Sequence, residues 1–152
     1  MPAQPKQINV NVQQLWLSNI VADTFPFIND SGADMILVPG TLIGRVAASS
    51  KLKVFKSTNT DGSENPRYLF YGVNPWNTVT VPNGATMNLP FANNAEVNQN
   101  AIVFALNTDN WNTQINSATE YVSGTVKDLL LQNGQFILRP TTELSNYDNP
   151  LP

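Results

Sequence analysis

The chain has 152 residues, of which 41% are hydrophobic, so it is long and apolar enough to bury one core, and we predict a single domain. A net charge of −3 with only eight Lys and Arg residues argues against a nucleic-acid-binding surface. The absence of Cys and His excludes disulfides, thiolate chemistry, zinc fingers and the commonest general base. No apolar run approaches the roughly 18 residues that a membrane span needs, and no signal peptide is visible, so we expect a soluble protein made in a cytoplasm.

The N-terminal stretch predicts an arm followed by a strand. Residues 1–7 contain two prolines and no apolar pattern, which predicts a mobile arm. Ile8, Val10 and Val12 then alternate with polar residues, as in a half-buried strand. The alternation changes phase at Gln13 and Gln14, which indicates a bulge or a change of partner. Such a stripe near a terminus can pair with its own sheet or with the edge of another chain, and the pattern alone leaves both open.

A β-hairpin is predicted over Val38–Phe55. Thr41–Val46 is a β-branched, apolar strand pattern that follows a Pro-Gly turn. A small polar loop separates it from Leu52–Lys56, which alternates with period two. Gly44 lies inside the first strand, where glycine indicates a bulge or the close approach of another backbone.

Further short strands are expected on both sides of this hairpin. Met35–Val38 precedes it, Tyr68–Val73 follows it, and Ala101–Leu106 is apolar throughout, as in a central strand. The residues that follow, Asn107–Asn116, have the composition of a loop.

A second hairpin is predicted around Pro82-Asn83-Gly84, a strong turn signal. Thr78–Val81 would enter this turn, and Ala85–Phe91 would return from it. Pro90 predicts that the returning strand lies at a sheet edge, because proline has no N–H for a ladder.

One helix is predicted within Gly124–Gly134. Thr125 is the expected N-cap, and Gly134 is the expected C-terminal stop. Val126, Leu129 and Leu130 share one face, and Gln135–Arg139 follows as a strand. The expected fold class is therefore mainly β (α+β), a small antiparallel sheet or open barrel with one short capped helix and an N-terminal arm.

The sequence predicts no catalytic, cofactor-binding or metal-binding residue, and hence no enzyme. The Asn59–Asn65 loop faintly resembles a calcium loop, but it has too few ligands, and a plain turn is the better interpretation. Asp61 and Glu64 form the nearest carboxylate pair, and they lie in the same turn. No nucleophile elbow or phosphate-binding loop occurs.

The aromatic residues permit a binding function, that of a glycan-binding module in a phage fibre or surface protein. Aromatic rings can stack on sugars, although in strands they are more often core or interface residues. The candidates are Trp16, Trp76, Trp111, Tyr68, Tyr71 and Tyr121.

Three motifs together resemble the head decoration proteins of tailed bacteriophages, the family of phage lambda protein D. They are the glycine-bounded strand Gly40–Val46 with its partner, the strand from Tyr68, and the capped helix ending in Asn133-Gly134 before a strand. A Thr-Thr-Glu-Leu stretch at 141–144 completes the likeness, which covers roughly Ile36–Leu144 and departs from the family pattern at Asn74–Asn100.

The resemblance implies a homotrimer at threefold positions of an expanded head, which clamps neighbouring major capsid proteins against DNA pressure. It implies location on the outer surface of the virion capsid after synthesis in the bacterial cytoplasm. Residues 1–14 would be the capsid-binding arm, ordered on the capsid by strand addition, and 15–152 the decoration domain. The predicted capsid-binding residues are Ile8, Val10, Val12, Leu15 and Trp16. The predicted trimer interface consists of Trp76, Leu89 and Phe91.

Overall fold

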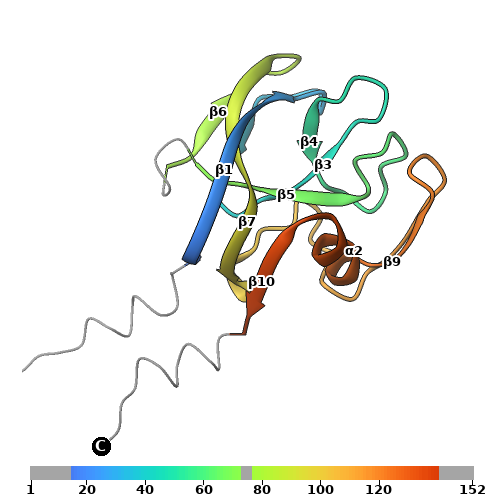
Figure 1. Cartoon of the computed structure of the whole chain (residues 1–152). Helices are drawn as coiled ribbons and strands as arrows, with labels where there is room; N and C mark the ends of the chain where they lie inside the picture. Colours follow the sequence, from blue (N-terminus) through green and yellow to red (C-terminus); the bar gives the residue numbers. More distant parts are fainter. Residues whose placement is uncertain (1–14, 73–76, 141–152) are drawn as a thin grey trace, which may run out of the picture.

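Five strands form a closed ring in the computed structural model, which describes residues 15–72 and 77–140 (Figure 1). The ring has the order β1-β4-β3-β5-β7 and closes because β1 pairs with β4 on one side and with β7 on the other. The strands are β1 (Trp16–Ile28), β3 (Leu42–Arg45), β4 (Leu52–Val54), β5 (Pro66–Phe70) and β7 (Thr86–Asn98).

Smaller elements extend and cover this ring. β10 (Gln135–Arg139) adds to β7 as a parallel strand. Two antiparallel ribbons, the 3-10 turn η1 and the helix α2 lie outside the hydrogen-bonded sheet of the ring. These elements are β2 (Met35–Leu37) with β6 (Val79–Val81), β8 (Gln114–Ser117) with β9 (Val122–Thr125), η1 (Gln99–Ala101) and α2 (Val126–Asn133). The predicted fold class, mainly β with one short helix, is confirmed.

β7 is the strand that the rest of the sheet shares. Along one side it pairs with β1 over most of its length. Along the other side it pairs first with β5 at Phe91 and Ala92, and then with β10 from Asn94 to Asn98. The 13-residue strand β7 lies between β1 on one side and β5 and β10 on the other. It therefore fixes the position of both ends of the described chain, which lie in β1 and just after β10.

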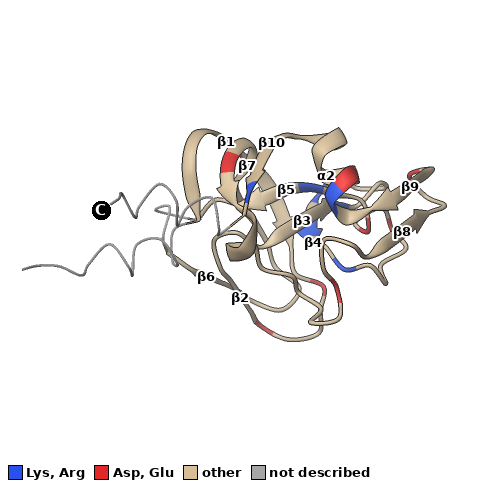
Figure 2. Cartoon of the chain, turned by 90° about the horizontal axis from the view of Figure 1, so that it is seen from below, with Lys and Arg blue, Asp and Glu red and all other residues tan. Residues whose placement is uncertain are grey.

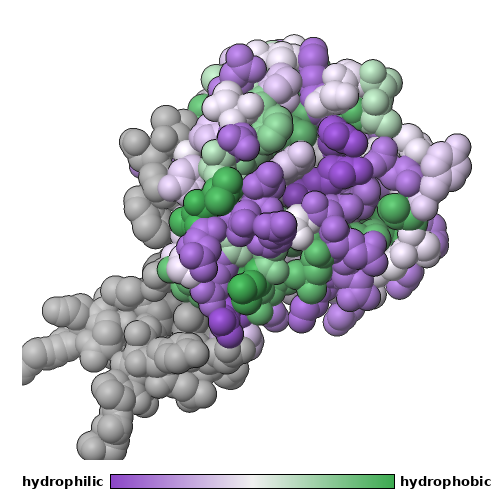
Figure 3. Space-filling view, in the orientation of Figure 1, coloured by the Kyte–Doolittle hydropathy of each residue, from purple (hydrophilic) through white to green (hydrophobic). Residues whose placement is uncertain are grey.

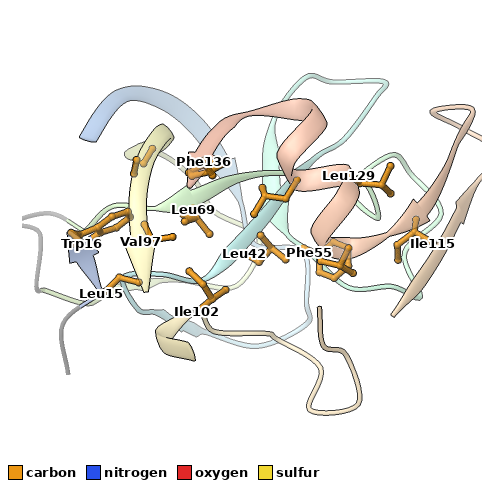
Figure 4. Packing of buried hydrophobic residues seen from close by; sticks show 14 residues of the cluster. Leu15, Trp16, Leu42, Phe55, Leu69, Val97, Ile102, Ile115, Leu129 and Phe136 are labelled. Carbon is orange, nitrogen blue, oxygen red and sulfur yellow. The ribbon is translucent and has the colours of Figure 1, made fainter. Parts of the chain in front are cut away.

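Much of the wall of the ring is buried on both faces. One cluster takes side chains from all five ring strands, such as Phe27, Ile43 and Phe70, and so fills the interior; we call it the barrel core. The alternate residues, such as Leu42 and Leu69, face outward into a second cluster beneath α2, which we call the outer core. Figure 4 shows the outer core as one layer from Leu15 and Trp16 to Ile115.

The predicted hairpin at Val38–Phe55 is confirmed by the pairing of β3 with β4. Both expectations for Gly44 are also confirmed. The register between β3 and β5 shifts at this residue, and a Cβ built on it would lie 2.1 Å from the carbonyl oxygen of Ser63. The polar loop before β5 therefore packs directly on the backbone of β3.

The predicted helix is confirmed as α2. The Thr125 hydroxyl accepts a hydrogen bond from the backbone N–H of Asp128, which makes it the N-cap. Gly134 ends the helix with extended backbone, and a Cβ there would meet the ring of Phe136 at 2.5 Å. The glycine is thus needed for close packing on β10 rather than for a left-handed turn.

The second predicted hairpin is wrong, although its turn is present. Ala85 donates to the carbonyl of Pro82 and Gly84 has φ +79°, but β6 then pairs with β2, whereas β7 pairs with β1. The edge prediction from Pro90 is also wrong. The Pro90 carbonyl accepts a hydrogen bond from the N–H of Tyr71, which follows the last residue of β5. In an antiparallel pair the N–H and C=O of one residue point to the same neighbour, so the N–H that Pro90 lacks would face the place where the pairing of β5 with β7 ends.

Two other parts of the sequence reading differ from the structure. Ala101–Leu106 forms no strand; it contributes the end of η1 and a single parallel bridge from Val103 to Thr41. Conversely, most of β1 and the β8–β9 ribbon were not predicted.

The Gly44→Ala variant is expected to lose about 3 kcal/mol or more of unfolding free energy, because its methyl group would overlap the Ser63 backbone. Gly32→Ala is the control, since no atom lies within 4 Å of its Cβ position and only backbone strain of about 1–2 kcal/mol remains. Urea unfolding measures both. A Gly44→Ala loss no larger than that of the control would contradict the close packing.

The Leu130→Ala variant is expected to lose about 2–5 kcal/mol, because Leu130 is fully buried in the outer core. The neighbouring Leu131 is 39% exposed, so Leu131→Ala is a matched control with a clearly smaller loss. Equal losses in urea unfolding would show that α2 does not depend on its buried face.

Candidate binding surface at the terminal end of the barrel

The two ends of the described chain lie at the same end of the barrel. Trp16 at the start of β1 and Leu138 near the end of β10 are both paired with Val97, from opposite sides of β7. Two strand spacings, about 10 Å, therefore separate the points to which the terminal segments attach. We call this region, defined by Trp16, Val97 and Leu138, the terminal end. Residues 1–14, including the predicted binding residues Ile8, Val10 and Val12, lie outside the described residues.

The prediction that Leu15 and Trp16 contact a capsid is corrected by their burial. Each is only 5% exposed and belongs to the outer core. The Trp16 ring packs on Tyr71 with centroids 5.3 Å apart, and the Leu15 carbonyl accepts a 2.9 Å hydrogen bond from the N–H of Asn98. These two residues anchor the start of the described chain, because burying their apolar surface is far more favourable than exposing it.

Glu96 on β7 ties the two terminal strands together. Its carboxylate accepts hydrogen bonds from the Ser18 hydroxyl of β1 and from Arg139 Nε of β10. The Ser18 hydrogen bond, followed by that from Arg139, holds the pKa of Glu96 below its usual value of 4.5. The terminal end is thus crossed by one charge-assisted network that spans three strands.

The solvent-exposed face of β1, β7 and β10, opposite the outer core, combines apolar and amide side chains. Val21 on β1 and Ile137 on β10 are each 50% exposed. Between them Asn94 donates a 3.0 Å hydrogen bond to Gln135, beside a groove of about 340 Å³. Figure 3 shows hydrophobic patches over β1 and β10 within a hydrophilic surround. In Figure 2 the visible acidic and basic positions are interspersed over the elements.

The predicted trimer-interface residues Leu89 and Phe91 lie inside the barrel core. They are 4% and 0% exposed, because both belong to the inward-facing register of β7. Their assignment to a surface between subunits is therefore corrected. Trp76 lies outside the described residues.

The Asp61 and Glu64 carboxylates have separate partners. Asp61 lies 2.9 Å from Lys53 Nζ, whereas Glu64 is buried and accepts a 2.5 Å hydrogen bond from the Ser117 hydroxyl. Burial acts to raise the pKa of Asp61, but hydrogen bonds from Ser63 and Lys53 outweigh it and lower that pKa. Within residues 15–72 and 77–140 no group of three acidic side chains is placed to hold a metal ion.

The candidate sugar-stacking aromatics do not form one platform. Trp16 and Tyr71 pack on each other, and Tyr68 packs on Phe25. Trp111 is half-buried against Phe104, and its indole N–H donates to the carbonyl of Gln99. Of the described candidates only Tyr121 is largely exposed, at 91%.

No family model matches the chain, and neither does any curated protein or solved structure. In the described part of the chain, no helix is long and apolar enough to cross a membrane.

Acidification is expected to weaken the Glu96 network. Because the pKa of Glu96 is lowered on folding, its contribution to stability is present above about pH 4.5 and is lost as the pH falls below that value. The unfolding free energy of the unsubstituted protein should therefore fall more between pH 7 and pH 3 than that of Glu96→Gln. Asp23→Asn, which alters an exposed carboxyl on β1, is the control and should retain the full pH dependence.

Proposed function

We propose that the chain is a structural decoration protein of a phage head, which binds the outer surface of the expanded capsid and has no catalytic role. The observation that supports this most directly is the shared position of Trp16 and Leu138 beside Val97. Residues 1–14 and 141–152 thereby start from one end of a rigid barrel and can contact a single surface.

The N-terminal segment is proposed to bind by adding a strand to an edge of the major capsid protein. Backbone hydrogen bonds would supply affinity, and the alternating Ile8, Val10 and Val12 side chains would set the register. Leu15 and Trp16 contribute as anchors, since their burial fixes the point from which the segment leaves the barrel. A fixed origin reduces the conformational entropy that is lost when the segment binds.

A homotrimer at threefold positions is the proposed form on the head. Three weak strand contacts on one particle act together and raise avidity without any new type of contact. Because Leu89 and Phe91 are internal, the surfaces between subunits must be built from exposed residues. The buried hydrogen bond between Glu64 and Ser117 belongs to this same structural role, because it holds the polar loop before β5 against the β8–β9 ribbon.

Deletion of residues 1–14 is expected to leave the barrel folded, because Leu15 and Trp16 remain, and to abolish attachment to heads. Co-sedimentation with expanded, undecorated heads of the encoding phage measures attachment, and circular dichroism with urea unfolding measures the fold. A folded truncated protein that still co-sediments as the full chain does would refute strand addition by the arm.

A further inference from the structure

We propose that, in the absence of heads, the outer edge of β10 binds residues 8–12 of a second copy of this chain, so that copies assemble by exchanging their N-terminal segments. This contact is made between copies and does not depend on head binding. The segment that pairs with a capsid strand on the head would pair with a neighbouring copy before attachment.

β10 offers an open edge of five residues in the described part of the chain. β1 also has an open edge, since its pairing with β4 is confined to Phe27, but that strand contains Pro26 and shifts register several times against β7. β10 pairs with β7 over five consecutive residues without a register shift, and β7 is its only described partner strand. The two ribbons have shorter strands, of three residues in β2 and β6 and four in β8 and β9. Natural sheets commonly protect an edge with charged side chains, proline or a bulge. Gln135–Arg139 has no proline and no register shift, and its one charged residue, Arg139, ends the strand in an ion pair with Glu96.

The exposed side chains of this edge suit an apolar strand. Ile137, in the middle of β10, is 50% exposed on the face opposite the outer core. An added strand over residues 8–12 would place the branched side chains of Ile8, Val10 and Val12 on one face beside it, as favourable cross-strand pairs. No charge opposes the contact, since residues 7–14 are uncharged and Arg139 is engaged with Glu96.

The length of the connecting chain favours a second copy over the same chain. A strand added at the outer edge of β10 would lie three strand spacings from β1, about 14 Å. Four residue steps separate Val12 from Trp16, and they span at most about 14 Å when fully extended. That path would also have to pass around the ends of β7 and β10. If the segment ran antiparallel to β10, Val12 would lie at the far end of the strand, which is farther still.

The resulting contact is head-to-tail, because the segment of one copy meets the edge of the next. Such contacts close into a ring when the rotation between copies permits it, and otherwise continue as an open chain. Three copies closed in this way would form a trimer in solution, and its β10 contacts would open when the segments transfer to the capsid.

The first test is the mass of the full-length protein without heads, by light scattering coupled to size exclusion. The unsubstituted protein is expected at a multiple of the chain mass of 16.7 kDa, and Ile137→Lys at the mass of one chain. Leu131→Lys introduces the same charge at an exposed leucine on α2 and should keep the unsubstituted mass. Circular dichroism confirms that each variant is folded.

The second test mixes two variants that each lack one half of the contact. Ile137→Lys keeps the segment, and Val10→Lys keeps the edge, so each alone should have the mass of one chain. Their mixture should form a complex of two chains, because the intact segment of the first meets the intact edge of the second. A mixture that stays at the mass of one chain would overturn the proposal, as would an unsubstituted protein of that mass or variants that assemble unchanged.

Head co-sedimentation separates this inference from the proposed function. A chain that binds heads but has the mass of one chain in solution overturns only the exchange of segments. A chain that assembles through β10 but does not bind heads overturns only the decoration role.

Discussion

The structure depends on a single strand with neighbours on both sides and side chains buried on both faces. β7 holds β1 along one edge, and β5 and then β10 along the other. Phe91 points into the barrel core while the next residue, Ala92, points into the outer core. A slip of β7 by one residue would turn its barrel-core side chains to the outer core and the reverse. The register of β7 therefore determines the register of each strand that pairs with it. The helix and the terminal end are positioned by the same constraint.

Local signals in the sequence predicted the elements that local chemistry determines. The N-cap at Thr125, the stop at Gly134 and the pairing across Val38–Phe55 each depend on a few adjacent residues. Gly44 was informative because a glycine within a β-branched strand has few explanations, and the Ser63 backbone supplies one of them. The class of fold followed from these elements and from the frequency of turn signals.

Elements that depend on distant partners were not accessible in this way. β1 mixes exposed and buried residues irregularly because its pairing with β7 contains several register shifts, which break a period of two. The turn at Pro82–Gly84 was recognised, but the pairing of its flanks is decided by β2 and β1, which are remote in sequence. The burial of Leu89 and Phe91 could not be predicted for the same reason. An alternating strand shows that one of its faces is apolar, but not whether that face packs in a core or against a partner chain. The Glu96 network joins strands from three parts of the chain, and no spacing in the sequence reveals it.

The pairing of both Trp16 and Leu138 with Val97 also bears on how the order of the chain relates to its fold. A linker of about three residues spans the roughly 10 Å between these strand ends. A circular permutant that joins residue 140 to residue 15 could therefore keep every strand neighbour of the ring. The turn at Gly32, where nothing packs within 4 Å of the Cβ position, provides a site for new termini. The barrel is defined by which strands lie side by side, and the point at which synthesis begins is, for its packing, arbitrary.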